Sequence, residues 1–459
     1  MFFIGETVAI TQEKWGIKPQ LGIFGNRIII VWQEYSPTWG SDIFYQIRTR
    51  DGKKIISMGI VNEDTTSFNQ SSPCVATGKD MALVVWEDGR EGTNTHIYAQ
   101  FFNKDGKSGK NFRIDDDTAD VYHNRPHATF IEPDLFFIAW QDIRRGNYDI
   151  FAQWISCHGK ILGSNIPVST SKNWEYAPLT LSFSNSVFVV WQSQNNGVYE
   201  IKGKYVDVPF ISVSAYKKRK SMRLSGKDRL LLALCKYKGS PYILWKDYRE
   251  SLLFLHNVEG DSSREVGDKS CISPFVTGNE SIYLFYVKNR DTLSSLIYLN
   301  KRKEEQTLVE SKTHEIYNPS GIVINDTIYL VWVESSRENA FWDIHFGIFY
   351  TEAPVIDHLQ CTTERPMERF KLYPPSPNPF KEHTRIRFEI PITSEVNILI
   401  YDALGRKVKT LVKHEYQPGQ YTITWDGTDS HGNSLPPGTY FCVFYTKEYR
   451  KSIKIMIIR

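Results

Sequence analysis

Residues 83 to 100 read LVVWEDGREGTNTHIYAQ, and the 459-residue chain contains seven copies of this pattern. Each copy is an apolar run that ends in an aromatic anchor, then a polar turn, then a second run of alternating residues. The anchors are Trp32, Trp86, Trp140, Trp191, Trp245, Tyr286 and Trp332. They recur every ~40 to 55 residues, a period typical of propellers, solenoids and repeat arrays.

Each copy also contains turn signals and, in six of the seven, a proline before the anchor: Pro19, Pro73, Pro126, Pro178, Pro274 and Pro319. A proline there fits the first residue of a strand, where its missing N–H does least harm. With the turn signals, each copy predicts four short antiparallel strands, which form one propeller blade. We therefore predict an all-β, seven-bladed β-propeller over residues 1–351. The N-terminal strand, Phe3 to Thr11, would complete the last blade and so remove an exposed edge.

The composition excludes several functions. An aromatic content of 14% suits half-buried strands. The formal net charge of +3 is too small to recruit nucleic acid by neutralising phosphates. No apolar run approaches the ~18 to 20 residues that span a bilayer. The opening MFFIGETVAI lacks the features of a signal peptide. We expect either a cytoplasmic protein or a chain whose export signal precedes these residues.

The sequence predicts no metal site and no cofactor. Its six cysteines are scattered and form no Cys-x-x-Cys pair, so zinc and a disulfide framework are not expected. The acidic run 115–117 with Asp120 lacks the ligand order and central glycine of a calcium loop. We interpret this run, and the Asp426–Asn433 turn, as solvated turns.

The repeat ends near residue 351. Residues 352–372 are polar and aperiodic and predict a linker. Residues 373–459 form a different small β domain, with strands expected at 385–390, 396–401, 421–425, 439–445 and 452–458. So many short alternating strands favour an immunoglobulin-like sandwich.

The last segment contains YPPSPNPF, IRFEIP, VNILIYDALGRKVKTL, GQYTITWDGTDSHGNSLPPGTYF and RKSIKIMIIR. In this order and spacing, the motifs resemble the C-terminal sorting domain of type IX secretion substrates. They are also similar to the immunoglobulin-like domain of flagellar hook-capping proteins. The resemblance implies that residues 373–459 are read by an outer-membrane secretion translocon. It therefore implies an extracellular or cell-surface location. The repeats more loosely resemble propellers of secreted bacterial proteins.

One recurrent motif, Trp-x-Asp-x-Arg, contains residue types that could bind a substrate or ligand. It occurs at Trp86, Trp140 and Trp245. Because it recurs from blade to blade, we interpret it as scaffold. Sialidases also use propellers, but the Ser-x-Asp-x-Gly-x-Thr-Trp boxes that they usually carry are missing from this sequence. No sequence pattern identifies a pair of carboxylates that could catalyse hydrolysis, so we predict no catalytic residue.

Ligand sites are expected where the repeats differ, in the segments that lead into each first strand. The candidate ligand-binding residues there are Trp15, Tyr122, His123, Asn124, Arg125, Trp174, Tyr176, Tyr317 and Asn318. Aromatic faces beside amide and guanidinium donors suit a sugar ring or a peptide. The alternative is that these rings wedge between blades.

The favoured hypothesis is a secreted or cell-surface, non-enzymatic propeller that binds a glycan or a protein. Two alternatives stay open: a carbohydrate-active, sialidase-like hydrolase, and a structural surface adhesin. Fold alone does not decide among them.

Overall fold

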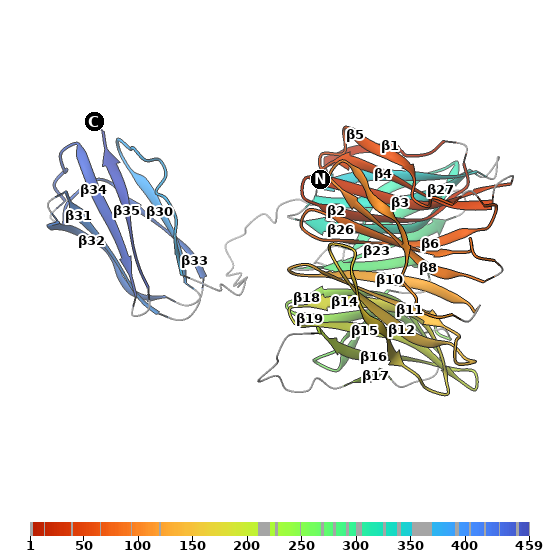
Figure 1. Ribbon diagram of the computed structural model, residues 1–459. Coiled ribbons are helices and arrows are strands. Elements are labelled where there is room, and N and C mark those ends of the chain that lie inside the picture. The colour runs from red at the N-terminus through yellow and green to blue at the C-terminus, as the bar shows by residue number, and fades with distance from the viewer. Residues whose placement is uncertain are drawn as a thin grey trace. The chain divides into compact units, whose positions relative to one another are not determined.

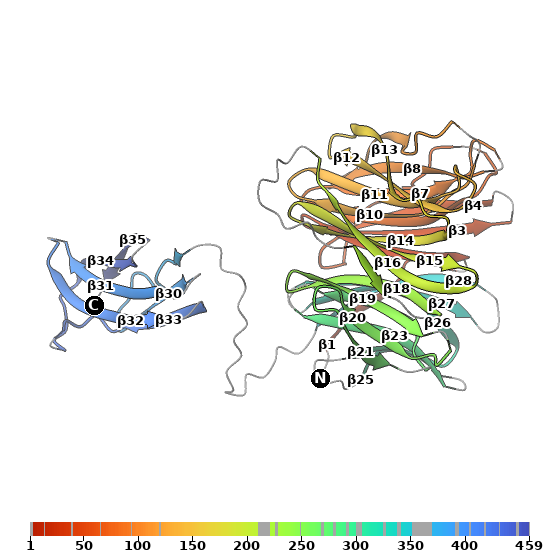
Figure 2. The same ribbon diagram turned by 90° about the horizontal axis from the view of Figure 1, so that it is seen from below.

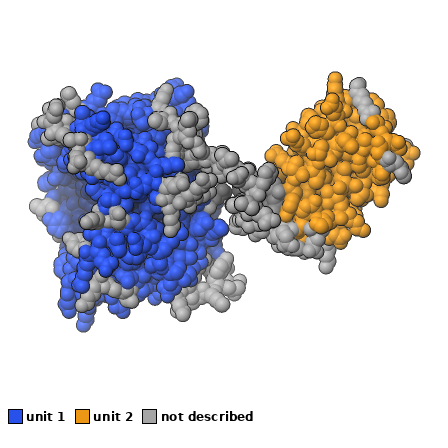
Figure 3. Space-filling model, turned by 180° about the vertical axis from the view of Figure 1, so that it is seen from behind, with its two compact units in different colours: residues 1–354 blue, residues 355–459 orange. Residues whose placement is uncertain are grey.

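The computed structural model describes residues 3–350 and 370–458, apart from residues 13, 38–39, 65, 93, 119–120, 210–220, 225–227, 248, 268–269, 279–280, 291–292, 300–304, 325–326, 337–340, 391–393, 404, 417–418, 431 and 447–448. Every regular element in these ranges is a β-strand (Figures 1 and 2). The chain divides into two compact units, Met1–Pro354 and Val355–Arg459 (Figure 3). The predicted all-β class is confirmed.

The described strands of the first unit form seven four-stranded antiparallel sheets. The first sheet contains β2 (Gly16–Phe24), β3 (Arg27–Ser36), β4 (Gly40–Thr49) and β5 (Ile55–Ile60). The second contains β6 (Gln70–Thr77), β7 (Ala82–Asp88), β8 (His96–Asn103) and β9 (Gly106–Arg113). The third contains β10 (His123–Ile131), β11 (Leu135–Asp142), β12 (Asp149–Ser156) and β13 (Ile161–Ser169).

The remaining sheets follow the same order along the chain. The fourth contains β14 (Trp174–Phe183), β15 (Ser186–Asn195), β16 (Val198–Asp207) and β17 (Met222–Leu224). The fifth contains β18 (Arg229–Tyr237), β19 (Ser240–Asp247), β20 (Leu253–Asn257) and β21 (Ser262–Gly267). The sixth contains β22 (Ile272–Gly278), β23 (Ile282–Arg290), β24 (Leu293–Leu299) and β25 (Glu305–Ser311). The seventh contains β26 (His314–Ile324), β27 (Thr327–Ser336), β28 (Trp342–Tyr350) and β1 (Phe3–Ala9).

The sheets pack in a ring because each buries apolar side chains against the next. One core cluster joins the first and second sheets through residues such as Val31 and Trp86. Equivalent clusters join each following pair, and the last joins the seventh sheet to the first through Val331 and Ile30. The first strand of each sheet contacts the first strands of its two neighbours, so these strands form the inner wall. This is the propeller arrangement.

The N-terminal strand completes the last sheet. β1 pairs antiparallel with β28, and the Ile10 amide beyond it donates to the Ile344 carbonyl at 2.7 Å. The Thr11 hydroxyl donates to Asp343 at 3.0 Å. The ends of the first unit are therefore joined by strand pairing, as the repeat pattern predicts.

The position predicted for the repeated proline is wrong. Instead of starting the first strand, each proline lies inside it, directly after a residue with positive φ: 51° at Lys18, 53° at Ser72, 52° at Arg125, 47° at Ala177, 46° at Ser273 and 46° at Asn318. The strand register shifts at each of these places, which marks a β-bulge. A bulge leaves a residue unpaired, so proline is tolerated there without the loss of a ladder hydrogen bond.

The second unit is built from two sheets. One contains β29 (Lys371–Leu372), β30 (Thr384–Ile390) and β33 (Gly419–Trp425). The other contains β32 (Lys407–Tyr416), β31 (Ser394–Asp402), β34 (Gly438–Tyr445) and β35 (Arg450–Ile457). Both bury side chains in one core, which includes Phe388, Trp425 and Phe444. β29 and β32 were not foreseen among the strands expected from the sequence.

The predicted linker, residues 352–372, lies outside the described residues except for its last three, and Lys371 and Leu372 pair with β30. Over the ranges that the structure covers, no helix is long and apolar enough to cross a membrane. Cys74, Cys157, Cys235 and Cys442 are free thiols.

Candidate functional site

The Trp-x-Asp-x-Arg motif forms a closed turn in the second and third sheets. In the third sheet, the Trp140 indole donates to Asp142 Oδ2 at 3.0 Å. Arg144 donates to the same carboxylate through Nε at 3.0 Å and a terminal nitrogen at 2.7 Å. Its guanidinium lies 4.3 Å from the Phe151 ring centroid. The indole, carboxylate and guanidinium groups thus hydrogen-bond to one another, so the motif is part of the scaffold.

Three aromatic rings gather over the third and fourth sheets, at the end where first strands begin. Tyr148 precedes β12, and Trp174 and Tyr176 lie at the start of β14. The ring centroids are 5.6 Å apart for Tyr148 and Trp174, 5.8 Å for Tyr148 and Tyr176, and 6.2 Å for Trp174 and Tyr176. We call these three residues the aromatic platform. Trp174 keeps 42% of its surface exposed, so a ligand can reach it.

Hydrogen bonds fix the Tyr176 ring and the backbone beside the other two rings of the platform. The Tyr176 hydroxyl donates to Gln194 Oε1 at 3.0 Å, and Gln194 donates to the Tyr199 hydroxyl at 3.0 Å. The Glu175 amide donates to the Tyr148 carbonyl at 2.8 Å, which ties β14 to the turn before β12. The platform is therefore preorganised, which lowers the entropy cost of binding.

Polar groups border the platform. Burial raises the pKa of Tyr148; the charges of Tyr122 and Glu87 raise it further and the Arg125 guanidinium lowers it. The Arg125 backbone N–H donates to Glu87 at 2.8 Å. Tyr122 is 44% exposed, and Arg125 is exposed at the bulge of β10. Two of the residues predicted from the sequence, Trp174 and Tyr176, are thus in ring contact, and the charges of two others, Tyr122 and Arg125, act on the neighbouring Tyr148.

A second aromatic cluster lies at the same end, over the seventh and first sheets. The Trp15 ring centroid is 5.8 Å from that of Tyr35 and 6.0 Å from that of Phe341. Trp342 follows Phe341 and is 43% exposed. Backbone bonds from Tyr35 to Trp15 and from Trp342 to Lys14 hold these segments together. Trp15 therefore does not share a site with the platform residues named above.

The other predicted residues have different surroundings. Tyr317 packs against the core between the seventh and first sheets, as the wedge alternative describes. Asn318 is exposed at the bulge of β26. Asn124 is half-buried and donates to the Thr95 hydroxyl at 3.1 Å. His123 is fully buried between the second and third sheets.

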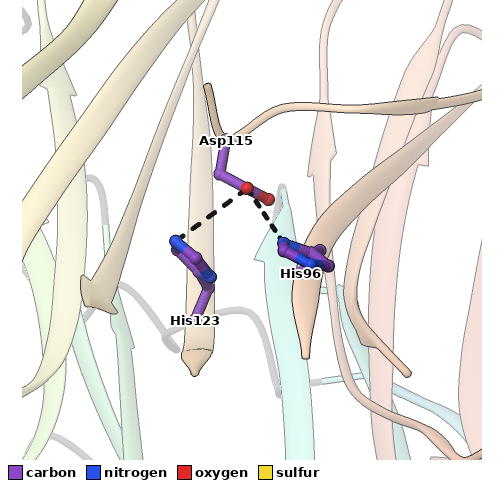
Figure 4. Close-up of side chains that lie close together, drawn as sticks. All are labelled: His96, Asp115 and His123. Carbon is purple, nitrogen blue, oxygen red and sulfur yellow. Dashed lines mark hydrogen bonds and ion pairs between the residues drawn. The ribbon is translucent and has the colours of Figure 1, made fainter. Parts of the chain in front are cut away.

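His123 belongs to a buried polar cluster (Figure 4). His96 Nδ1 lies 3.1 Å from Asp115 Oδ1, and His123 Nε2 lies 3.9 Å from the same oxygen. Burial pushes the pKa of Asp115 up, but His96, His123 and Arg113 outweigh it and hold the pKa at about 2. The solvated-turn interpretation is wrong for Asp115, which is only 5% exposed. Two overlapping sets of side chains here have the donor types and spacing of a metal site.

Sequence reasoning missed Tyr148 and Tyr199. Tyr148 stands in the NYD turn, directly before the acid that opens a third strand. An aromatic residue holds the same place in two other copies, Tyr199 before Glu200 and Trp342 before Asp343, and this recurrence was the available signal.

Comparison with solved structures finds similar all-β chains at low identity. A sialidase of Trypanosoma rangeli in complex with the inhibitor DANA has 7% identity and a TM-score of 0.44, over 98% of this chain and 87% of that one. The polysaccharide lyase Uly1 has 7% identity and a TM-score of 0.49, over 72% and 89%. A GH43 endo-arabinanase from Bacillus licheniformis has 13% identity and a TM-score of 0.30, over 50% and 94%.

No curated protein matches the chain in sequence. One family model does match a part of it: the FlgD Ig-like domain, over residues 378–447. This segment spans β30 to β34 and both sheets of the second unit. The C-terminal unit is therefore an Ig-like domain similar to that of FlgD.

Proposed function

We propose that the first unit is a non-enzymatic propeller that binds a glycan on the aromatic platform. The observation that carries this proposal is the exposed Trp174 ring, which packs against Tyr148 and against Tyr176, whose hydroxyl is hydrogen-bonded. Sugar rings present C–H faces that stack on aromatic faces, and their hydroxyls need nearby polar groups. Arg125, Tyr122 and Glu87 border the platform and supply both donors and acceptors. A binding site of few fixed polar groups around an apolar surface is typical of small-molecule recognition.

The test is a screen of the full chain on an oligosaccharide array, followed by titration with the best-bound oligosaccharide. Trp174→Ala and Tyr148→Ala are expected to weaken binding by about 1 to 3 kcal/mol each, because each removes a stacking face. Trp342→Ala is the matched control: it removes a tryptophan of nearly equal exposure, 43% against 42%, at the same end of the propeller. We expect this control to bind as the unaltered protein does.

Two results would contradict the proposal. One is an array on which no oligosaccharide binds. The other is a Trp174→Ala variant that binds as tightly as the unaltered chain. Equal losses in Trp174→Ala and Trp342→Ala would instead place the glycan across both aromatic clusters.

We also propose that the Ig-like domain directs export through a type IX translocon to the cell surface. The resemblance of residues 373–459 to sorting domains supports this, together with an independent core that lets the domain fold alone. Lys451 and Lys454 are exposed on β35, the strand nearest the C-terminus. Deletion of residues 452–459 is expected to leave the protein in the periplasm of a type IX-competent cell that expresses it behind a signal peptide. Surface labelling at the level of the full chain would contradict this role.

A further inference from the structure

Three carboxylates converge on one buried imidazole between the second and third sheets. His123 Nε2 lies 3.3 Å from Asp142 Oδ2, 3.6 Å from Asp117 Oδ2 and 3.9 Å from Asp115 Oδ1. The His123 and Asp142 side chains are fully buried, and Asp117 keeps 13% of its side chain exposed. Buried charges of this kind must be paired or must coordinate a metal.

The other ring nitrogen of His123 fixes the tautomer. Nδ1 lies 3.1 Å from the Thr95 carbonyl oxygen, which can only accept a hydrogen bond, so Nδ1 carries the proton. Nε2 therefore faces the carboxylates with its lone pair unless it binds a second proton or a cation. Among the described residues, Nε2 has no hydrogen-bond partner. A histidine whose far nitrogen donates to a backbone carbonyl has the usual orientation of a metal ligand.

The separations favour a metal ion over a proton. An imidazolium N–H bonds a carboxylate at about 2.7 to 2.9 Å, shorter than any of the three distances here. Ligand atoms around a tetrahedral ion are ~3.3 Å apart, because bonds of about 2.0 Å meet at the tetrahedral angle. The 3.3 and 3.6 Å separations from Asp142 and Asp117 agree with that geometry.

The charges of the cluster leave room for a cation. Arg113 pairs with Asp115, and Arg144 pairs with Asp142 and, at 3.9 Å, with Asp117. Two guanidinium groups thus face three carboxylates, so the acids outnumber the arginines around His123. Asp142 Oδ2 also accepts from the Trp140 indole, so this oxygen would be shared between the ion and its existing donors.

Neighbouring interfaces do not offer the same donors. The place of His123, two residues before the bulge residue, is held by Gln70 in the second sheet and by Glu175 in the fourth. Gln70 donates to Asp64 at 3.3 Å, and Glu175 accepts from Ser171 and from Lys202. One side-chain oxygen of each lacks a partner among the described residues, a place that buried water suits. Water is therefore the competing occupant beside His123.

We propose that His123, Asp117 and Asp142, with Asp115 alongside, bind a divalent ion of the zinc class between the second and third sheets. A mixed set of imidazole and carboxylate donors suits zinc and its transition-metal neighbours, whereas calcium takes oxygen ligands only. The ion ties the start of β10, which follows Tyr122 and carries Arg125, to the segment that follows β9 and carries Asp117. It therefore fixes the border of the aromatic platform without taking part in it. This proposal does not depend on glycan binding.

The experiment uses the full, untagged chain. After metal removal by chelation, titration with Zn²⁺ is expected to show one site per chain and to raise the melting temperature. Co²⁺ is expected to give the intense visible absorption of a four-coordinate ion. His123→Gln, which installs the residue that the preceding interface uses, is expected to lower Zn²⁺ affinity by at least about 100-fold.

His256→Gln is the matched control. His256 is also buried, and its Nε2 also lacks a hydrogen-bond partner among the described residues, but the nearest acid that it faces is Asp261 at 4.0 Å. We expect this variant to bind Zn²⁺ with unchanged affinity. Asp117→Asn serves as the second ligand variant if His123→Gln does not fold.

Three results would overturn the proposal. The first is no binding of Zn²⁺ and no change in melting temperature, in which case water fills the space. The second is unchanged Zn²⁺ affinity in both His123→Gln and Asp117→Asn. The third is stabilisation by Ca²⁺ but not by Zn²⁺, which would remove the imidazole from the ligand set.

Discussion

The third and fifth sheets carry the same Trp-x-Asp-x-Arg motif and use it differently. In the third, Trp140 and Arg144 both donate to Asp142, and the Arg144 side chain is only 16% exposed. In the fifth, the Trp245 indole N–H has no partner among the described residues. Arg249 there leaves its motif aspartate, pairs with Asp228 and is 65% exposed. One sequence motif thus gives two side-chain networks.

The difference begins on the first strand of each sheet. In the fifth sheet the place of His123 is held by Arg229, whose guanidinium lies 4.6 Å from the Trp245 ring centroid. Phe254 stacks on Trp245 at 4.4 Å between centroids. The cation over the anchor tryptophan in the fifth sheet is thus Arg229, whereas Arg249 turns away and pairs with Asp228. The backbone turn survives, since the Arg249 amide still donates to Asp247 at 2.9 Å.

The motif therefore encodes a turn, whereas the side-chain network depends on residues of the neighbouring sheet. The aspartate accepts the backbone N–H two residues later in both sheets, which is a local property. The indole and guanidinium bonds depend on residues that arrive from elsewhere in the chain. A recurrent motif is therefore firm evidence for a turn and weak evidence for a charge network.

Of the substitutions considered for the two sheets, Trp140→Ala should lower the stability of the protein most. We expect a loss of about 3 to 5 kcal/mol in the free energy of unfolding, because Trp140 is fully buried and its removal leaves a cavity. Trp245→Ala is expected to cost about 1 kcal/mol less, because no hydrogen bond from the indole is lost. Urea denaturation of the full chain, followed by far-ultraviolet circular dichroism, measures both. Equal losses would contradict the extra cost expected from losing the indole bond to Asp142.

The fold could be predicted from the sequence because strand periodicity and repeat length are local properties. The anchors Trp32 to Trp332 set the number of sheets, and the alternating runs set their strands. The bulge could not be predicted, since Pro126 alone is equally compatible with a strand start. That choice depends on how Arg125 is held: its backbone N–H donates to Glu87 of the preceding sheet at 2.8 Å.

The candidate site was predictable only in part. Trp174 and Tyr176 fall where first strands begin, and their places follow from the blade plan. Tyr148 could not be found, because its proximity to them arises from packing between two sheets. The same holds for His123 and its acids: Asp115 follows the last strand of the second sheet, and Asp142 ends the second strand of the third. A single sequence shows each residue but not the ring packing that brings them together.

A smaller effect on stability is expected at the aspartates that open the third strands of two sheets. Burial raises the pKa of Asp149 to about 6, against an ordinary value of 3.8, and Arg145 offsets this only partly. In the seventh sheet, Asp343 holds the same place but accepts hydrogen bonds from the Thr11 hydroxyl at 3.0 Å and the Lys14 amide at 3.2 Å. The two positions therefore differ in how well the carboxylate is satisfied.

Asp149→Asn should stabilise the protein at neutral pH. A carboxyl whose folded pKa is raised holds its proton more tightly in the folded state. Its contribution to stability is thus complete below the unfolded pKa near 3.8 and is lost as pH rises through about 6. Asparagine keeps the neutral form at every pH. We expect a gain of about 1 to 3 kcal/mol at pH 7.5, since each pKa unit corresponds to about 1.4 kcal/mol, and no gain near pH 4.

Asp343→Asn, which weakens two charge-assisted bonds, should show no such gain. Urea midpoints across this pH range decide the matter: a pH-independent effect of Asp149→Asn would mean that the carboxylate is stabilised by partners that the burial argument leaves out.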